Sequence, residues 1–302
     1  MRTYGFSWFR QFGSPCFIFS RNLFLRKASK HMKGLAYKLK KYFGIMLYMQ
    51  KIDLMNRMAY RINFFISVLT VALQMVFSLV FISVLFSSNR TVAGWGFYEA
   101  VLVVGSYMLI EGLMWASCAY LNALNKNIKD GTLDGIILRP VDTQFLISVW
   151  RGDMEDLARV VSGIGVISFA LIHLDFAAGQ LFLNLFLYLI LIFCAFIITY
   201  SVNVFLRSVT FWTIQGDALF HISMAITRIT QYPSDIFFNK AARFATTFVV
   251  PIAFMATIPA KILAHGFDWK LASLAVLMAA IFFFSSRWFF HFALKHYESG
   301  SS

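Results

Sequence analysis

The chain has 302 residues, of which 59% are hydrophobic, 18% are aromatic and only 14% are charged. Ordinary soluble domains carry about 25% charged residues, and 35 phenylalanines would give a soluble protein an extensive apolar surface. Several apolar runs reach the roughly 18–20 residues that a helix needs to cross a bilayer. Because these runs are continuous and do not alternate as barrel strands do, the sequence predicts an all-α integral membrane protein and excludes a soluble globular one.

The positive charge is concentrated at the N-terminal end of the chain. The formal net charge is +13, and 13 of the 27 Lys and Arg residues lie within residues 1–61, where Asp53 is the only acid. That placement is typical of a cytoplasmic segment under the positive-inside rule, and it favours contact with anionic membrane lipid. We therefore expect no nucleic-acid partner.

Residues 1–31 are predicted to be a basic and aromatic N-terminal extension, and residues 32–61 an amphipathic helix in the membrane interface. The helix prediction depends on apolar residues that recur at helical spacing among lysines. These apolar residues are Leu35, Leu39, Phe43, Met46, Leu47 and Ile52.

Residues 62–297 are predicted to form a six-helix transmembrane domain, followed by a polar tail at 298–302. The domain belongs in the cell inner membrane, with both termini in the cytoplasm. The third span is the weakest of those that can be placed, because it contains Ser162, Gly163 and Gly165. The five spans that can be placed directly are 62–86, 98–121, 157–174, 181–206 and 271–292.

The region between 207 and 266 leaves two layouts open. In one, residues 211–230 cross the membrane and residues 235–264 form a broken, re-entrant pair of half-helices on the outer side. In the other, residues 211–242 are cytoplasmic and residues 243–264 cross. We favour the first layout, because prolines within one short span would leave backbone acceptors unpaired in lipid. The prolines of this region are Pro233, Pro251 and Pro259.

A polar loop at residues 122–153 separates the second and third spans and has strong turn signals. Gly131 and Gly135 permit positive φ, and Pro140 prevents Arg139 from continuing a helix. A shaped loop of this kind on a membrane protein predicts a docking surface for a soluble partner.

Four of the ionisable residues inside the predicted spans are candidates for a translocation path or an intramembrane polar contact. Glu111 is near the middle of the second span, where a charged side chain costs about 2.5–3.5 kcal/mol on insertion scales. It is expected either to line a substrate or proton path, or to be a structural acid paired with a neighbour such as Arg228. Asp217, His221 and Arg228 share one helix face and are expected to line a path or to pair with one another.

No set of residues assembles a catalytic centre. The chain has no Gly-x-x-x-x-Gly-Lys-[Ser/Thr] phosphate loop, no His-Glu-x-x-His and no Gly-x-Ser-x-Gly. The three cysteines are scattered, and no histidine pair has metal-ligand spacing. We therefore expect no catalytic residues, no metal and no cofactor on this chain.

Two stretches of the sequence resemble one family. Ile128-x-x-Gly131-x-Leu133-Asp134-x-x-Ile137-Leu138-Arg139-Pro140-Val141, and downstream Tyr232-Pro233-x-x-Ile236 with Ile258-Pro259-Ala260, resemble the membrane-spanning permeases of ABC-2-type ABC transporters. More narrowly, they resemble the bacterial group of uncharacterised ABC transport system permeases. The likeness covers roughly residues 35–297.

The resemblance implies a type V exporter-like transmembrane fold and a function as the permease subunit of an ATP-driven exporter. ATP and Mg would bind to a partner ATP-binding subunit, and a second permease, identical or related, would complete the transporter. A coupling helix near Asp142–Trp150 would dock on the ATPase, with Asp142 as its N-cap. The residues expected at this contact are Gly131, Leu133, Asp134, Arg139, Pro140, Asp142, Phe145, Leu146 and Trp150.

Two alternatives stay open. One is an ion-coupled secondary transporter that uses Glu111, Asp217 and Arg228. The other is a membrane-embedded enzyme in which Glu111 and His221 carry the chemistry. The sequence identifies no substrate.

Overall fold

The computed structural model describes residues 37–38, 40–56, 61–87, 91–174, 178–213, 216–236, 244–266 and 268–297, and nearly all of them are helical. The chain divides into two compact units, Met1–Tyr48 and Met49–Ser302. In the first unit, the described residues 37–38 and 40–48 are helical; in the second, 49–56 are helical. The predicted helix is therefore present over 40–56, and its position in the membrane interface stays a prediction.

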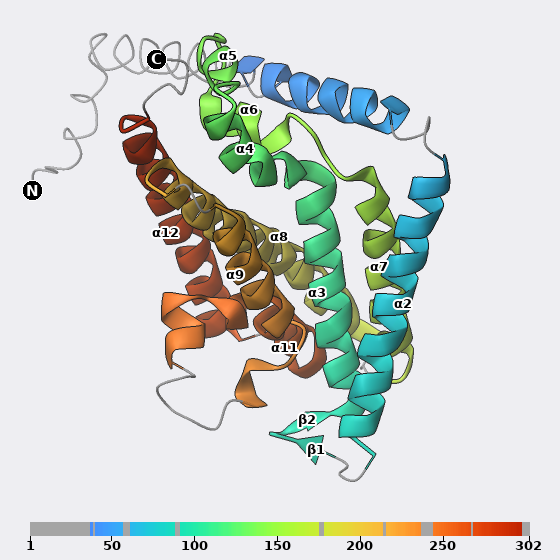
Figure 1. The fold of residues 1–302 in the computed structure, drawn as a ribbon. Helices are drawn as coiled ribbons and strands as arrows, with labels where there is room; N and C mark the ends of the chain where they lie inside the picture. Colours follow the sequence, from blue (N-terminus) through green and yellow to red (C-terminus); the bar gives the residue numbers. More distant parts are fainter. Residues whose placement is uncertain are drawn as a thin grey trace, which may run out of the picture. The chain divides into compact units, whose positions relative to one another are not determined.

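The second unit consists of long helices joined by short ones (Figure 1). The helices before the loop are α2 (Arg61–Leu85) and α3 (Phe97–Cys118), linked by strands β1 (Thr91–Val92) and β2 (Trp95–Gly96). The loop region holds the 3₁₀ turn η1 (Ala119–Ala123), α4 (Leu124–Lys129), α5 (Asp134–Ile137), α6 (Thr143–Val149) and η2 (Met154–Asp156). After it come α7 (Leu157–Ile172), α8 (Ala178–Ser208), η3 (Val209–Phe211), α9 (Gly216–Ile229), η4 (Ser234–Ile236), η5 (Ala245–Val249), η6 (Ala253–Thr257), α11 (Ile258–His265) and α12 (Trp269–Leu294).

Among the described residues, four helices are long and apolar enough to cross a membrane: Phe64–Leu85, Phe97–Lys129, Leu181–Phe211 and Trp269–Leu294. They coincide with four of the predicted spans, and the protein is a multi-pass membrane protein. The predicted third and fifth spans are shorter helices, α7 with 16 residues and α9 with 14. At about 1.5 Å per residue these fall short of a bilayer core of about 30 Å. Six full-length spans are therefore not observed.

The two strands form a hairpin between α2 and α3. Thr91 pairs with Gly96, and Val92 pairs with Trp95. The connecting residues Ala93 and Gly94 both have positive φ, at 53° and 84°. Two consecutive positive-φ residues are typical of the type I′ turns that fit the twist of a hairpin. In Figure 1 the hairpin lies at the end of α3 opposite α4, α5 and α6.

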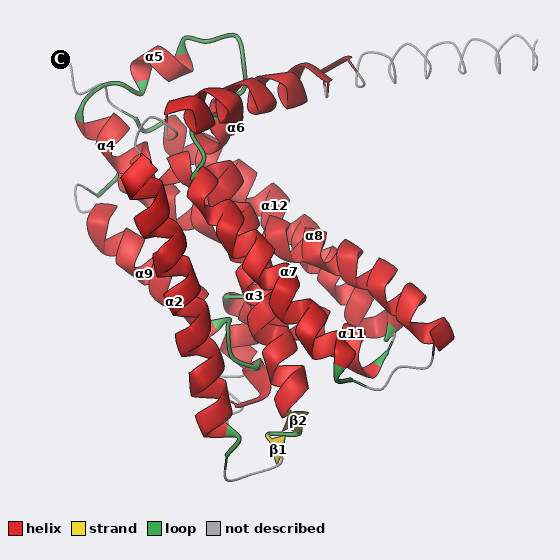
Figure 2. Ribbon diagram, turned by 90° about the vertical axis from the view of Figure 1, so that its right-hand side faces the viewer, coloured by secondary structure: helices red, strands yellow, loops and turns green. Residues whose placement is uncertain are grey.

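Helices α3 and α7 pack backbone to backbone through glycines (Figure 2). A Cβ on Gly163 would lie 2.7 Å from the Leu109 nitrogen, and one on Gly112 would lie 2.8 Å from the Val160 nitrogen. Small residues let membrane helices approach this closely. Gly163, whose presence made the third span weak in the sequence, is therefore a packing residue.

Helix α3 lies at the centre of the apolar core, whereas α2 is largely exposed. Val101, Leu102, Val103 and Val104 of α3 are fully buried over four consecutive positions, so every side of the helix is covered there. In α2, Val71 and Ile82 are buried, and most of its other large apolar side chains are exposed. Exposed apolar side chains on such a helix are suited to contact with lipid.

The segment between η4 and α12 is helical but broken. Its helical stretches, residues 244–249 and 252–265, are interrupted at Pro251, and residues 245–249 and 253–257 have π-helical geometry. Residues 251–260 are all buried, which is the situation in which broken helices are tolerated at membrane depth. Pro259 lies at the start of α11, where a missing N–H costs little.

Both ends of this segment lie beside the hairpin and the start of α3. At one end, the Trp95 indole nitrogen donates to the Asp235 carboxylate at 3.1 Å. At the other end, His265 Nε2 lies 3.3 Å from Glu99 Oε1. Near η4, the Ser234 backbone N–H donates to the Thr257 hydroxyl at 3.1 Å, which ties the two parts together. The segment thus begins and ends at the same end of α3.

Candidate functional site

The loop between the second and third spans is folded into short helices. α4 ends in a turn at Gly131, where φ is 69°, and the Leu133 N–H donates to the Asn127 carbonyl at 3.1 Å. Leu133 is fully buried, so it fixes the turn to the protein and does not lie on the surface. Gly135, which also permits positive φ, lies within α5 and does not adopt it.

α6 begins where the sequence predicted, with Asp142 as its N-cap. The Phe145 N–H donates to Asp142 Oδ1 at 2.9 Å, which satisfies one of the free donors at the start of a helix. α6 has seven residues and ends at Val149. The predicted helix Asp142–Trp150 is thus confirmed, with Asp142 and Trp150 as the capping residues at its two ends.

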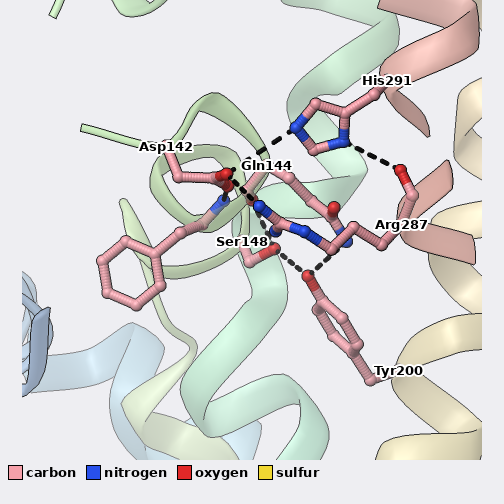
Figure 3. A network of polar contacts seen from close by, with 7 residues as sticks. Asp142, Gln144, Ser148, Tyr200, Arg287 and His291 are labelled. Carbon is pink, nitrogen blue, oxygen red and sulfur yellow. Dashed lines mark hydrogen bonds and ion pairs between the residues drawn. The ribbon is translucent and has the colours of Figure 1, made fainter. Parts of the chain in front are cut away.

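The Asp142 carboxylate also joins α6 to α12 (Figure 3). Arg287 Nη2 donates to Asp142 Oδ2 at 2.6 Å, and His291 Nε2 lies 3.7 Å from the same oxygen. Burial raises the pKa of Asp142, but the hydrogen bonds from Arg287 and from the Phe145 backbone outweigh it. The pKa of Asp142 is therefore below its usual value, and the carboxylate is charged at neutral pH.

A second contact joins α6 to α8. The Gln144 side-chain nitrogen donates to the Tyr200 hydroxyl oxygen at 3.1 Å, and the Ser148 and Tyr200 hydroxyl oxygens are 2.8 Å apart. In Figure 3 these side chains face one another between α6 and α8. α6 is thus attached by polar side chains to two of the four long apolar helices.

The predicted contact residues of α6 differ in their exposure. Leu146 is only 2% exposed and packs into the protein, so in this structure it is not a surface anchor. Phe145 and Trp150 are partly exposed. The Arg139 guanidinium carbon lies 4.3 Å from the centre of the Trp150 ring, a cation–π contact that fixes the Trp150 side chain to the residue before Pro140.

The outermost part of the loop is the bend between α5 and α6. Leu138 is 85% exposed, and Arg139 and Pro140 beside it are also exposed. Asp134, also expected at the contact, is partly exposed at the start of α5. In the sequence, Leu138 was noted only as part of the family motif between Ile128 and Val141, and not as a contact residue. An isolated exposed leucine is ordinary on a surface, but this one lies on the bend that leads into α6.

The end of the loop is fastened to the helix at residues 49–56 and to the end of α3. Arg151 Nε donates to Asp53 Oδ1 at 3.0 Å, and the Gln50 side-chain nitrogen donates to the Ser117 carbonyl at 3.1 Å. A Cβ on Gly152 would overlap the Ala116 carbonyl oxygen and the Gln50 side chain. Only glycine fits at position 152 without displacing these groups.

A cavity of about 870 Å³ lies between α2, α3, η2 and α9. Its α2 wall is mainly apolar, with Val71, Phe77, Val80, Phe81 and Val84. The facing walls carry polar side chains, among them Glu111, Trp115, Asp156, Arg159, Arg228 and Tyr232. The α2 wall is therefore mainly apolar, apart from Gln74 and Ser78, and the charged side chains all lie on the facing walls.

Glu111 lies in this cavity wall and is only 3% exposed. Within the part of the chain that the structure describes, its side chain has one hydrogen bond, from the Trp115 indole nitrogen to Oε1 at 2.7 Å. The alternative of a structural ion pair between Glu111 and Arg228 is not observed. Arg159 lies 3.2 Å from Asp156 and donates to Gln74 at 3.2 Å, so that guanidinium is compensated.

The predicted stripe on α9 is only partly brought to the cavity. Arg228 lines it together with Phe220 and Met224, whereas His221 is exposed and does not line it. The side chain of Asp217 lies outside the described residues. The structure does not bring Glu111 and His221 to one site.

Sequence reasoning missed the partners of α6. Tyr200 carries no local signal, since its contact with Ser148 of α6 joins residues far apart in the chain. Arg287 could have been found, because a charged residue in an apolar span needs a partner. The same signal applies to Arg207, which is buried at the end of α8 and donates to the Ser223 hydroxyl at 3.3 Å.

The chain was compared with models of known protein families. The model described as ABC-2 family transporter protein matches residues 72–301, which is most of the chain. The comparisons with curated proteins and with solved structures give no match.

Proposed function

Because the chain belongs to the ABC-2 family of transporter proteins, we propose that it is the permease subunit of an ATP-driven transporter. In this proposal, segment 122–153 couples the permease to a separate ATP-binding subunit, which holds ATP and Mg. The chain itself has no phosphate-binding loop. Export and assembly with a second permease are part of the proposal and follow from the family resemblance.

The observation that carries the proposal is the attachment of α6 to α8 and α12. A partner that pushed on the loop would act on these two long helices directly, through Arg287–Asp142 and through Tyr200 with Gln144 and Ser148. Rigid elements joined by a few polar contacts can change arrangement together. Leu138, Arg139 and Pro140 form the exposed bend that such a partner would contact first.

The experiment is co-purification of the full chain with the ATP-binding subunit, followed by a measurement of ATPase activity in membranes. Leu138→Asp is expected to reduce both the amount of ATP-binding subunit recovered and the ATPase activity by tenfold or more, because it puts a charge into an apolar contact. Thr91→Asp, an exposed position on the hairpin at the opposite end, is the matched control and should leave both unchanged. Equal ATPase recovery with Leu138→Asp and with the control would refute the docking assignment.

We also propose the six membrane crossings that the sequence predicts, with both termini in the cytoplasm. Helices α2, α3, α8 and α12 are long enough to cross by themselves, whereas α7 and α9 form only part of the crossings 157–174 and 211–230. The segment 235–264 would then enter and leave on the outer side. The contacts of Asp235 with Trp95 and of His265 with Glu99 support this layout, because both ends of the segment lie beside the loop between the first two crossings.

Cysteine labelling separates the two layouts. In a Cys16→Ser background, where the described cysteines Cys118 and Cys194 are buried, Asn239→Cys should react with an impermeant reagent added outside the cell. Leu138→Cys should react only after the membrane is opened. Reaction of Asn239→Cys only from the cytoplasmic side would establish the rival layout.

An ion-coupled secondary transporter is the second candidate, because Glu111 and Arg228 line one cavity. The co-purification experiment distinguishes it from the first. A chain that purifies alone and moves its substrate without ATP would favour ion coupling.

A further inference from the structure

The cavity between α2, α3 and α9 has the two-sided character of a site for an amphipathic molecule. Its α2 wall presents apolar side chains from Val71 to Val84, a length of about 20 Å along the helix. The facing wall carries an acid, Glu111, and a base, Arg228, from two different helices. An apolar chain would be shielded from water along α2 while a polar head faced α3 and α9.

Glu111 has no ion pair among the described residues, although Arg159 and Arg228 are close enough to act on it electrostatically. It is 3% exposed, and the described residues supply one donor, the Trp115 indole, and no cation within 4 Å. A carboxylate at this depth is costly unless a positive group is close. Trp115, Tyr107, Phe81 and Tyr232 also line the cavity, and aromatic faces attract alkylammonium groups.

Arg228 presents an exposed guanidinium group to the same cavity. None of the described residues forms a hydrogen bond or an ion pair with its side chain, although it lines the cavity with Glu111. Arg159 provides the contrast, since Asp156 and Gln74 already contact it. A guanidinium without a partner is suited to bind phosphate or carboxylate.

We propose, resting on the proposed transport function, that the cavity binds a zwitterionic amphiphile as the transported substrate. The ammonium group of the ligand lies at Glu111 and Trp115, its anionic group lies at Arg228, and its apolar chain lies along α2. A ligand with both charges compensates both unpaired groups at once, which neither a cationic nor an anionic amphiphile can do.

The test compares three probes that share one chain and differ in the head group. The full chain, held in an amphiphilic polymer without detergent, is titrated with dodecylphosphocholine, dodecyltrimethylammonium and dodecyl phosphate. The zwitterion should bind about tenfold more tightly than either of the others. Loss of the ionic and cation–π contacts of the quaternary ammonium group, or of the charge-assisted hydrogen bond from Arg228 to the phosphate, each weakens binding by about that factor. Equal affinities for the three probes would overturn the proposal.

Two variants assign the charges. Glu111→Gln should remove the preference for the zwitterion over dodecyl phosphate, and Arg228→Gln should remove the preference over dodecyltrimethylammonium. His221→Gln, on the same helix but outside the cavity lining, is the control and should keep both preferences. Unchanged head-group preferences in both cavity variants would overturn the proposal.

A measurement on the unmodified chain covers the case in which a variant does not fold. Dodecylphosphocholine with a photoreactive group at the end of its chain should label peptides from α2. Labelling confined to other helices would contradict the proposed site. These measurements need no ATP-binding subunit, so their failure and the failure of the proposed coupling can be told apart.

Discussion

Two contacts between helices are built in opposite ways, α3 against α7 and α6 against α8 and α12. α3 and α7 meet backbone to backbone at Gly105, Gly112 and Gly163, with no space for a side chain. α6 meets its neighbours through an ion pair and hydrogen bonds of long side chains. The first contact is close-packed, so α3 and α7 can adopt few other arrangements relative to each other. The second consists of a few polar contacts that can separate and reform, which suits a part that transmits movement.

The largest expected effect comes from filling the glycine contact. Gly163→Leu places a side chain where its Cβ alone would lie 2.7 Å from a backbone nitrogen of α3, so the two helices must separate. Overpacking usually lowers the free energy of unfolding by about 1–3 kcal/mol. Because this substitution also displaces backbone, we expect a loss at or above the upper end of that range. We expect loss of most of the folded protein, measured as the monodisperse fraction after solubilisation.

Gly165→Leu is the matched control for that substitution. Gly165 lies two residues away on the same helix, and nothing lies within 4 Å of a Cβ there. It should purify like the unmodified chain. Equal losses in the two variants would show that a larger side chain anywhere on this part of α7, and not the close contact with α3, accounts for the effect.

Breaking the α6 contact should have a smaller and more local effect. Arg287→Gln removes the charged partner of Asp142, which we expect to cost about 1–2 kcal/mol, since the pair is partly exposed. Hydrogen exchange of residues 143–149 should accelerate while exchange in α3 stays the same. His291→Gln, whose ring nitrogen is 3.7 Å from Asp142, should change exchange little. Uniform acceleration in both helices would contradict a local contact.

Tyr200→Phe tests the other half of the same contact. The substitution removes the hydroxyl that meets Gln144 and Ser148, at an expected cost of about 0.5–1.5 kcal/mol. Exchange of residues 143–149 should accelerate less than in Arg287→Gln. In the double variant Arg287→Gln with Tyr200→Phe, exchange of residues 143–149 should be faster than in either single variant. Exchange no faster than in the single variants would mean that the two contacts do not act separately.

The smallest expected effect is the pH dependence of the ion pair between Asp142 and Arg287, which should be negligible near neutral pH. The pKa of Asp142 is lowered in the folded protein, so the contribution of its ion pair is fully present above the unfolded value of about 3.9. It is lost as the pH falls through the lower, folded pKa. The ratio of the hydrogen-exchange rates in residues 143–149 to those in α3 should therefore stay constant from pH 7 to 5. It should change only below about pH 4. Asp142→Asn should not show that change.

The predictions that succeeded from sequence depended on local chemistry. The cap at Asp142, the turn at Gly131 and the four long spans each follow from a few neighbouring residues or from a long apolar run. Of the two glycines that permit positive φ in this loop, only Gly131 adopts it, because the conformation of Gly135 is set by α5 and not by residue type alone. The third and fifth spans were predicted longer than α7 and α9 are, since apolar composition continues beyond the helical residues.

The sequence by itself determined that this protein is helical and lies in a membrane, and that a folded polar loop follows the second span. Hydropathy and turn residues carry that information, because they act over a few residues at a time. Only the tertiary structure decided which of two similarly apolar helices is the core, with α3 buried and α2 largely exposed. It also decided the pairing of Asp142 with Arg287 and the presence of Glu111 and Arg228 in one cavity. In both cases the residues are more than a hundred positions apart in the chain, and only packing brings such residues together.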